Sequence, residues 1–533
     1  MTIFHMLLTS VSRRLVLAAV LTGAAGLVLG TLKPAYSGDP KTLVVSSASE
    51  AVTLDPHVSF DGQSPMLWRA SYETLVKYDG STLNIIPHLA ESYDISEDQL
   101  TYTFKLRPGV TFTDGTPLDA AAVKFNIERQ AKVEQGIAYA LGGIESIETP
   151  DDLTVVVKIG SPNDGFLSAF AGTYAIYMIS PKAVQEHEQD GDLAQSWLRH
   201  NMVGTGPYVL TNYTQAQQAV FERNPDYWQG WDGDHFERII VKYITEASTT
   251  RLLMERGEVD IALFLPDDVV EAMDGQPGIV VTNEPSFNLY YLMLPTHNTP
   301  TKDVKVRHAI SYGFDYETWT QDMMQGRAQQ ARGPLPSNLD GFDPNTPQYH
   351  YDPAKAKALL AEAGYPDGGF TIKYTYETGY WWKRPLGELF QANMKDLGIA
   401  VEIQELSPAA WAELLTNREQ AEHAYGLVWW PTLNSPSDYL WSMFHSGGQG
   451  TAGFNWNYYA NEEVDRLLDG APGEPDPTKR QEMYSRLQTI LMEDAPGLFV
   501  YEKNYRLPMR EEVQNFVFNG VYIEMLNFYA LHK

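Results

Sequence analysis

The sequence predicts an α/β protein made of two lobes. At 533 residues the chain is too long for one ordinary hydrophobic core. Residues 370–417 alternate strand-like and helix-like patterns, a βαβα order that favours an α/β lobe. A strand over 288–294 is expected to cross to the second lobe, and the chain is expected to return after residue 494. Two lobes joined in this way imply a hinge with a ligand cleft between them.

The first lobe is expected to combine short strands with few helices. Residues 101–106 alternate apolar and polar side chains, the period of a half-buried strand. Turn signals follow at 108–109 and 114–115, and a helix is expected to open at Leu118-Asp119. A second helix is expected over 64–76. The other expected strands are 42–46, 153–159, 208–213, 219–223, 238–244 and 259–263, with a helix over 249–256.

The second lobe is expected to hold most of the long helices. Residues 351–363 form one of them, with Asp352 as N-cap and Gly364 as its C-terminal stop. The other expected helices are 304–324, 386–397, 408–417 and 477–494, and the expected strands are 370–376, 401–405 and 425–429. Two last strands, 498–501 and 513–517, are expected to lie back in the first lobe.

Composition excludes several classes of function. The formal net charge of −29 argues against nucleic acid as a partner, because phosphate binding needs a basic surface. The absence of cysteine excludes disulfides, thiolate metal sites and a cysteine nucleophile. No GxSxG, P-loop or HExxH motif occurs. The one tight metal-like cluster, at 186–188, is better interpreted as a solvated helix face. We therefore expect no enzyme, no metal and no cofactor.

Residues 1–38 have the pattern of an export signal. Arg13 and Arg14 precede an apolar run, and small residues before Gly38 suit a signal peptidase. Residues 12–17 also resemble a twin-arginine signal, with an ordinary Sec signal as the alternative. A permanent membrane anchor is a further alternative, although the run is barely long enough to span. Without a cysteine for lipid attachment, we expect a soluble protein of the periplasm.

Five blocks occur in one order along the chain. The first, residues 89–129, reads LAESYDISEDQLTYTFKLRPGVTFTDGTPLDAAAVKFNIER. The later blocks are GTGPYVL (204–210) with NPDYW (224–228), DVKVRHAI (303–310), YDPAKAKALLAEAG (351–364) and NEEVDRLL (461–468). This set closely resembles the family 5 extracellular solute-binding proteins of ABC importers. The resemblance covers nearly the whole chain after the export signal.

The resemblance implies a two-lobe periplasmic binding protein (Venus-flytrap) fold with an extra subdomain. It divides the chain into lobe I at 39–285, with the subdomain at about 82–205, lobe II at 286–500, and a return to lobe I at 501–533. A member would be a monomer that captures a peptide or peptide-like solute and delivers it to a membrane permease. The alternatives are an oligosaccharide or sugar-conjugate receptor, a holder of diverse chains and, more distantly, an exported hydrolase.

Tryptophans are the first candidates for ligand contact. Trp429 and Trp430 stand where an expected strand ends, and strand ends in open α/β lobes face the cleft. Trp382 and Trp456 belong to neighbouring aromatic stretches. An aromatic face could stack on a sugar ring or cover an apolar side chain. Packing in the core is the alternative for each of these rings.

The resemblance adds polar candidates. Dipeptide-binding members hold the ligand's amine with an aspartate at the position that Thr432 occupies here, and its carboxylate with an arginine that Arg384 matches. Asn455 and Trp456 fall in a region that lines the cleft in relatives. With the arginine kept and the aspartate absent, we expect a ligand with an acidic or hydroxyl-rich end rather than a zwitterionic dipeptide.

Overall fold

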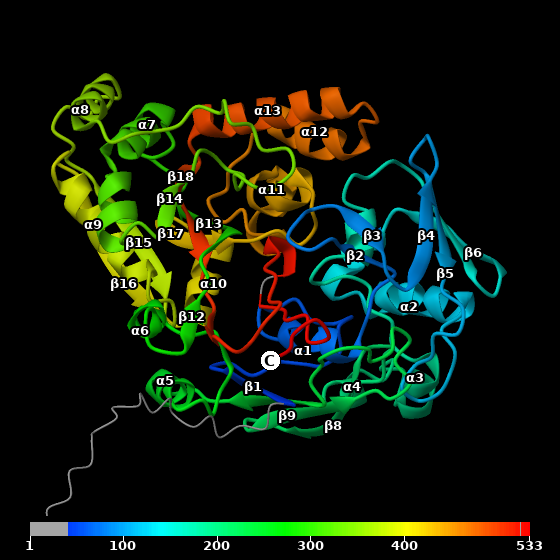
Figure 1. Cartoon of the computed structure of the whole chain (residues 1–533). Coiled ribbons are helices and arrows are strands. Elements are labelled where there is room, and N and C mark those ends of the chain that lie inside the picture. Colours follow the sequence, from blue (N-terminus) through cyan, green and yellow to red (C-terminus); the bar gives the residue numbers. More distant parts are fainter. Residues whose placement is uncertain (1–40, 523) are drawn as a thin grey trace, which may run out of the picture. The chain divides into compact units, whose positions relative to one another are not determined.

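The computed structural model describes residues 41–522 and 524–533, which belong to one compact unit. The predicted export signal at 1–38 therefore lies outside the described residues. The described chain has two lobes, each built on its own mixed sheet (Figure 1). Within the described residues, none of the helices combines the length and apolar character needed to cross a membrane.

The first lobe is built on a seven-stranded sheet. β1 (Thr42–Ser47) lies at its centre and pairs in parallel with a strand on each side. Those neighbours are β10 (Arg238–Tyr243) and β11 (Ile261–Leu263). β9 (Gln218–Arg223) and β8 (Tyr208–Thr214) form the expected hairpin at one edge. β19 (Pro508–Arg510) and β12 (Ile279–Val281) complete the sheet at the other edge.

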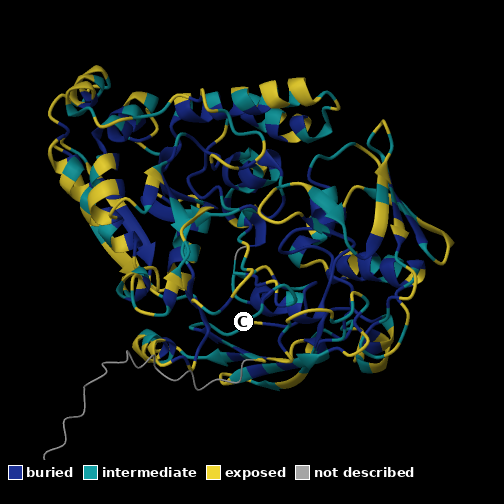
Figure 2. Cartoon of the chain, in the orientation of Figure 1, coloured by how far each residue is buried: buried dark blue, intermediate teal, exposed yellow. Residues whose placement is uncertain are grey.

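A four-stranded antiparallel sheet is attached to this lobe. Its strand order is β4 (Ala90–Ile95), β5 (Thr101–Leu106), β7 (Thr154–Ile159) and β6 (Ile144–Asp151). A two-stranded ribbon of β2 (Val76–Tyr78) and β3 (Ile85–Pro87) precedes it. β4 and β6 carry mostly exposed and half-buried residues, whereas β5 and β7 alternate buried and less buried positions (Figure 2).

Helix α2 contacts strands β6 and β7 of this sheet. It spans Ala120–Val133 and begins at Asp119, whose carboxylate accepts a hydrogen bond from Ala122 N at 2.8 Å, as expected for an N-cap. The shorter helices of the lobe are α1 (Pro65–Ser71), α3 (Pro181–His187), α4 (Gln195–Leu198), α5 (Ala247–Glu255) and α6 (Asp267–Met273).

The second lobe is built on a six-stranded sheet. Its order is β14 (Ala328–Gln330), β18 (Gly497–Tyr505), β13 (Glu284–Met293), β17 (His423–Trp429), β15 (Thr371–Glu377) and β16 (Ala400–Leu406). The parallel part, β17-β15-β16, corresponds to the predicted βαβα run. Separate apolar clusters pack on the two faces of the six-stranded sheet. Because β13 contributes residues to both clusters, it is buried along most of its length.

Helices surround this second sheet. Asp352 caps α8 (Pro353–Glu362) by accepting from Lys355 N at 2.9 Å, and Gly364 follows with a φ of +90°. The predicted helix over 477–494 is confirmed as α13 (Pro477–Asp494). The remaining helices are α7 (Val304–Gly313), α9 (Lys383–Lys395), α10 (Pro408–Thr416), α11 (Pro436–Phe444) and α12 (Glu462–Gly470).

Two short segments connect the lobes. Residues 282–283 separate β12 of the first sheet from β13 of the second. Residues 506–507 likewise separate β18 from β19. The segments bond to each other, because Thr282 N donates to Leu507 O at 3.1 Å and Leu507 N donates to the Thr282 hydroxyl at 2.9 Å. A pair of joined crossing strands is the structural element about which lobes of this kind can rotate.

Three sequence-based expectations are wrong. The strand expected at 498–501 lies in the second sheet, because β18 continues antiparallel beside β13 up to Tyr505. Residues 513–517 form no strand and make only an isolated bridge from Gln514 to His532. The helix expected over 304–324 ends at Gly313, since Phe314 is extended, and a short π-helical turn follows at Thr318–Met323.

Candidate ligand-binding site

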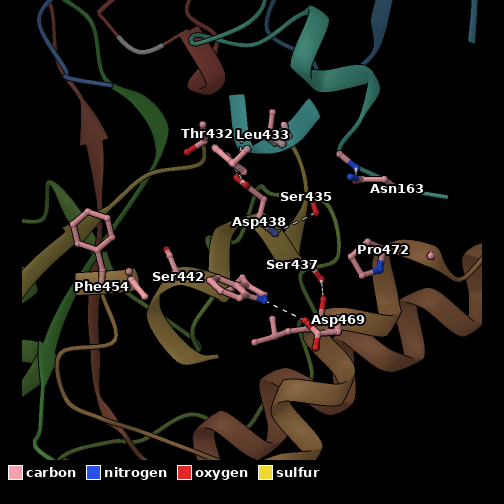
Figure 3. Close-up of a pocket in the computed structure, with 18 of the residues that line it drawn as sticks. Asn163, Thr432, Leu433, Ser435, Ser437, Asp438, Ser442, Phe454, Asp469 and Pro472 are labelled. Atoms are coloured by element: carbon pink, nitrogen blue, oxygen red, sulfur yellow. Dashed lines mark hydrogen bonds between the residues drawn. The ribbon is translucent and has the colours of Figure 1, made fainter. Parts of the chain in front are cut away.

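A cavity of about 700 Å³ lies between the lobes. The loop around Asn163 and the residues Phe60 and Tyr139 line it from the first lobe. The second lobe supplies the chain after β17, helix α11 and the end of α12 (Figure 3). Its size matches ordinary small-molecule sites, which measure roughly 300–1,000 Å³.

The loop between β17 and α11 shapes one wall of this cavity. β17 ends at Trp429, and the chain turns into α11 at Ser435, whose hydroxyl accepts a hydrogen bond from Asp438 N at 3.3 Å. The Asp438 carboxylate in turn accepts from Leu433 N at 3.1 Å. These two contacts hold the loop against the first turn of the helix, so that Thr432, Leu433 and Asp438 all line the cavity (Figure 3).

Asp438 is the central charged group of the site. The hydroxyl of Tyr139, from the first lobe, donates to its Oδ1 at 2.7 Å. Burial raises the pKa of Asp438 to about 6, and nearby Asp164 adds to the rise, while the hydrogen bonds from Tyr139 and Leu433 N oppose it. Its described hydrogen-bond partners are neutral groups. No Lys, Arg or His is among the described residues that line this cavity.

Aromatic rings cover much of the remaining wall. Phe60 stacks on Tyr174 with 4.9 Å between ring centroids and meets Tyr139 edge-on at 6.5 Å. On the opposite side, the ring centroids of Trp429 and Phe454 are 4.8 Å apart. Phe60 and Tyr139 are 43% and 55% exposed although both are large and apolar, so the cavity leaves aromatic surface that a ligand could cover.

The second charged lining residue is Asp469, at the α12 end of the cavity. It accepts from the Trp441 indole at 3.2 Å and lies 3.3 Å from His445 Nε2. His445 stacks on the Trp441 ring, with 4.6 Å between centroids. This carboxylate therefore already has a nitrogen partner that becomes cationic when protonated, unlike Asp438.

Asp164 connects the lobes beside the cavity. Its Oδ1 accepts from the Ser435 hydroxyl at 2.8 Å and its Oδ2 accepts from the Tyr484 hydroxyl at 2.5 Å. Its backbone N–H donates to Pro472 O at 3.2 Å. Burial raises the pKa of Asp164, and the two hydroxyl hydrogen bonds and the nearby Arg480 oppose that rise.

The structure brings only some of the predicted site residues to the cavity. Trp429 and Thr432 line it. Trp430 is half-buried, with its ring 6.1 Å from that of Trp429, and is not among the lining residues.

Three other candidates lie in the protein core. Trp382 packs edge-to-face on Tyr290 at 5.0 Å. Asn455 is fully buried and donates to the backbone oxygens of His445 and Tyr459. Trp456 is buried, and its indole N–H donates to Gly450 O at 3.0 Å. The polar groups of Asn455 and Trp456 are occupied by the protein itself, and none of the three residues lines the cavity.

Arg384 lies elsewhere, in the first turn of α9. It forms an ion pair with Glu388 at 2.9 Å, and 66% of its side chain is exposed. It borders a separate shallow depression of about 390 Å³, which Tyr380 and Trp381 also line. Arg384 and Thr432 therefore do not share one cavity, and a role for Arg384 in ligand binding stays a prediction.

Sequence reasoning missed Asp438, Tyr139, Phe60 and Phe454. The stretch from Ser435 to Asp438 has the S-x-x-D form of a capping box, which places an acidic residue at the start of a helix directly after the loop. That signal could have pointed to Asp438. The aromatic residues of the first lobe lie in irregular segments, where no periodicity shows which way a side chain points.

The comparison with family models decides the family. The model described as "Bacterial extracellular solute-binding proteins, family 5 Middle" matches residues 84–451. The chain belongs to this family. The predicted resemblance and the predicted two-lobe fold are both confirmed.

Named relatives agree with this assignment. The probable D,D-dipeptide-binding periplasmic protein DdpA of Escherichia coli (strain K12) is 33% identical over 95% of this chain and 98% of its own length. The glutathione-binding protein GsiB of Pectobacterium atrosepticum is 29% identical over 92% and 93% of the two chains. The chain is thus similar along its length to solute-binding proteins of ABC importers.

Solved structures show the same fold. HbpA2 from Haemophilus parasuis matches with a TM-score of 0.79 and 26% identity, over 92% of this chain and 99% of that one. The periplasmic binding protein DppA from Helicobacter pylori, in complex with the peptide STSA, matches with a TM-score of 0.77 and 25% identity, over 92% and 98%. As in a solute-binding protein, a cavity lies between two lobes.

Proposed function

We propose that this solute-binding protein captures a peptide or peptide-like solute in the cavity between its lobes. The single observation that carries the proposal is the cavity itself, which joins a half-buried carboxylate, Asp438, to aromatic walls at Phe60 and Trp429. Such a site offers one fixed polar contact and a broad apolar surface, which suits an amino-acid side chain next to a charged or polar end. The names of the relatives support a peptide-like solute.

The rest of the proposal concerns how the protein works in transport. Lobe I would comprise 39–283, with its subdomain at about 82–205, together with 506–533, and lobe II would comprise 284–505, since β13 begins at Glu284 and β18 ends at Tyr505. Rotation about the crossing segments near Thr282 and Leu507 would close the lobes over the solute. A soluble, monomeric protein in the periplasm would then deliver the solute to a membrane permease, without catalysing a reaction.

A sugar-containing solute is the second candidate. Trp429 and Phe454 present flat rings to the cavity, and the hydroxyls of Ser435, Ser437 and Ser442 lie nearby. Aromatic faces combined with hydroxyl groups suit the apolar faces and hydroxyls of a sugar ring.

Native mass spectrometry of the purified protein tests the proposal. The expected result is a co-purified compound with the mass of a peptide or a peptide conjugate, which is displaced when the protein is unfolded and rebinds saturably in calorimetry. A bound oligosaccharide would instead support the second candidate. Turnover of ester, glycoside or peptide substrates by the purified protein would contradict the transport proposal.

A further inference from the structure

A small polar pocket lies within the first lobe, apart from the cavity between the lobes. It has a volume of about 60 Å³ and shares none of its lining residues with the interlobe cavity. Arg69 of helix α1 and Lys77 of strand β2 both line it. The loop after β9 contributes Tyr227, and the C-terminal segment contributes Asn527 and Tyr529. The pocket therefore lies where three distant parts of the chain meet.

The two cations of this pocket are not neutralised by a carboxylate. Arg69 and Lys77 are half-buried, and neither forms an ion pair among the described residues. The guanidinium of Arg69 instead lies over the ring of Tyr522, with 4.4 Å between Cζ and the ring centroid. An aromatic contact of this kind is attractive, but it leaves the positive charge in place.

Glu73 is the one carboxylate that lines the pocket, and its acceptor positions are already used. Its Oε2 accepts from the Thr205 hydroxyl at 2.8 Å and from the Trp228 indole at 3.0 Å. Its Oε1 accepts from the Tyr227 hydroxyl at 2.8 Å and lies 3.1 Å from His88 Nε2. A carboxylate has about four acceptor positions, so Glu73, which is 4% exposed, has none left for the two cations.

Further positive charge stands close to Lys77. Burial lowers the pKa of Lys77, and the charges of Arg69 and Arg107 lower it further. The nearby carboxylates of Glu73 and Asp79 only partly offset these effects. Because the whole chain carries a formal net charge of −29, this local excess of positive charge results from the fold and not from the composition. Like charges held together in a partly buried place cost free energy, which a bound anion would offset.

We propose that this pocket binds a small tetrahedral oxyanion, of the phosphate or sulfate class, between Arg69 and Lys77. The volume suits such an ion, because one water-sized group needs about 10–15 Å³ and phosphate has five heavy atoms. Arg and Lys are the side chains that bind phosphate groups most readily, and the amides of Gln229 and Asn527 add neutral donors to the lining.

A bound oxyanion would tie the C-terminal segment to the first lobe. The segment lies beyond the crossing at residues 506–507 and lines the pocket together with α1 and β2. The ion would therefore stabilise the folded first lobe without entering the interlobe cavity. This inference does not depend on which solute the interlobe cavity takes.

Calorimetry of the purified protein with inorganic phosphate tests the inference directly. In a chloride buffer of constant ionic strength at pH 7, we expect saturable binding of one phosphate, with a Kd on the order of 1 mM or below. Sulfate should compete for the same site. At ten times the Kd, phosphate should raise the Tm by about 1–3 °C, whereas chloride at the same ionic strength should not.

Variants then assign the binding to the two cations. Arg69→Gln and Lys77→Gln should each weaken phosphate binding by about 10- to 100-fold, the range for a lost hydrogen bond to a charged group. The matched control is Lys158→Gln, which removes a positive charge that is paired with Glu148 outside the pocket, and it should leave the affinity unchanged. Thermal unfolding in chloride checks that each variant is folded, and the titration of the unmodified protein stands without any variant.

Three outcomes would overturn the inference. The first is no saturable binding of phosphate or sulfate up to about 10 mM. The second is an equal rise in Tm with chloride, which would show general screening of charge. The third is unchanged affinity in both the Arg69 and the Lys77 variant, which would place the bound ion elsewhere on the protein. Each of these outcomes leaves the proposed transport function intact.

Discussion

The hydroxyl of Tyr484, on helix α13, donates a hydrogen bond of 2.5 Å to the carboxylate of Asp164, in a loop of the first lobe. Ser435 donates to the other oxygen of the same carboxylate. Because one partner belongs to each lobe, these hydrogen bonds form only when the lobes are close together. They lie beside the cavity and are among the contacts that an open form would give up.

Removing this contact should favour the open form. Tyr484→Phe leaves Asp164 with one hydroxyl partner fewer. We expect this to destabilise the closed form by about 1–3 kcal/mol, because a half-buried carboxylate loses a hydrogen bond. We expect the ligand-free variant to show a larger radius of gyration in small-angle X-ray scattering than the unmodified protein. Saturating ligand should bring the two values together.

A matched control is Tyr349→Phe. The Tyr349 hydroxyl donates to Met492 O at 2.8 Å within the second lobe, so its loss should not change the distance between the lobes. Identical scattering curves for the Tyr484 and Tyr349 variants would show that the Asp164 contact does not hold the lobes together.

Acid should weaken the binding of a cationic solute. Burial raises the pKa of Asp438 to about 6 in the ligand-free protein, and a bound ammonium group would lower it again. Binding therefore releases a proton near pH 6, so the affinity is full above that pH and falls as pH drops through 6, by at most about tenfold per pH unit. Calorimetry of a dipeptide amide between pH 5 and 8 measures this slope.

Other ionisable groups near Asp438 could also contribute to this pH dependence of binding. Tyr139 stays neutral across the range, because desolvation of its hydroxyl, which points at Asp438, and the charge of Asp438 raise its pKa. Burial also raises the pKa of Asp164. Asp438→Asn should remove the slope below pH 6; an unchanged slope in this variant would mean that Asp438 is not the titrating group.

A buried ion pair should stabilise the first lobe. Arg129, on α2, makes two hydrogen bonds to Asp55, at 3.0 and 2.6 Å, and both side chains are almost fully buried. Asp55→Asn leaves the guanidinium buried without its counter-ion, and we expect a loss of about 3–5 kcal/mol in the free energy of unfolding. Denaturant unfolding followed by fluorescence gives this value.

The exposed pair Lys158–Glu148 supplies the comparison. Glu148→Gln should cost less than about 1 kcal/mol, because solvent screens a surface pair. Equal effects of the two substitutions would mean that burial of Asp55 and Arg129 does not matter for stability.

Two tryptophans predicted from sequence should behave differently. Trp429 lines the cavity, so Trp429→Ala should reduce ligand affinity by about 1–3 kcal/mol if its ring packs on the solute. Trp456 is packed in the core against Trp411, with 5.2 Å between centroids, so Trp456→Ala should lower the free energy of unfolding by about 3–5 kcal/mol. Calorimetry and denaturant unfolding of both variants separate the two roles. A Trp456 variant with full stability and weak binding would place that ring at the ligand instead.

Sequence patterns within a few residues predicted most of the helices and strands. The hairpin of β8 and β9, the capped helix α8, the βαβα run of the second lobe and helix α13 all follow from patterns within a few residues. Periodicity and capping act over one or two turns of chain, so a single sequence is enough to read them. The same local reading failed for β18, whose lobe is set by pairing with β13, about 200 residues earlier in the chain.

The sequence by itself determined the family, through five blocks in one order, and with it the two-lobe fold and the class of solute-binding protein. It also determined that Trp429 and Thr432 stand at a strand end. Only the tertiary structure decided which side chains meet at the cavity. Asp438 and Tyr139 are 299 residues apart, and their contact exists because two lobes bring a helix start and an irregular segment together. No spacing in the chain encodes a contact of that kind, because it depends on how both lobes pack.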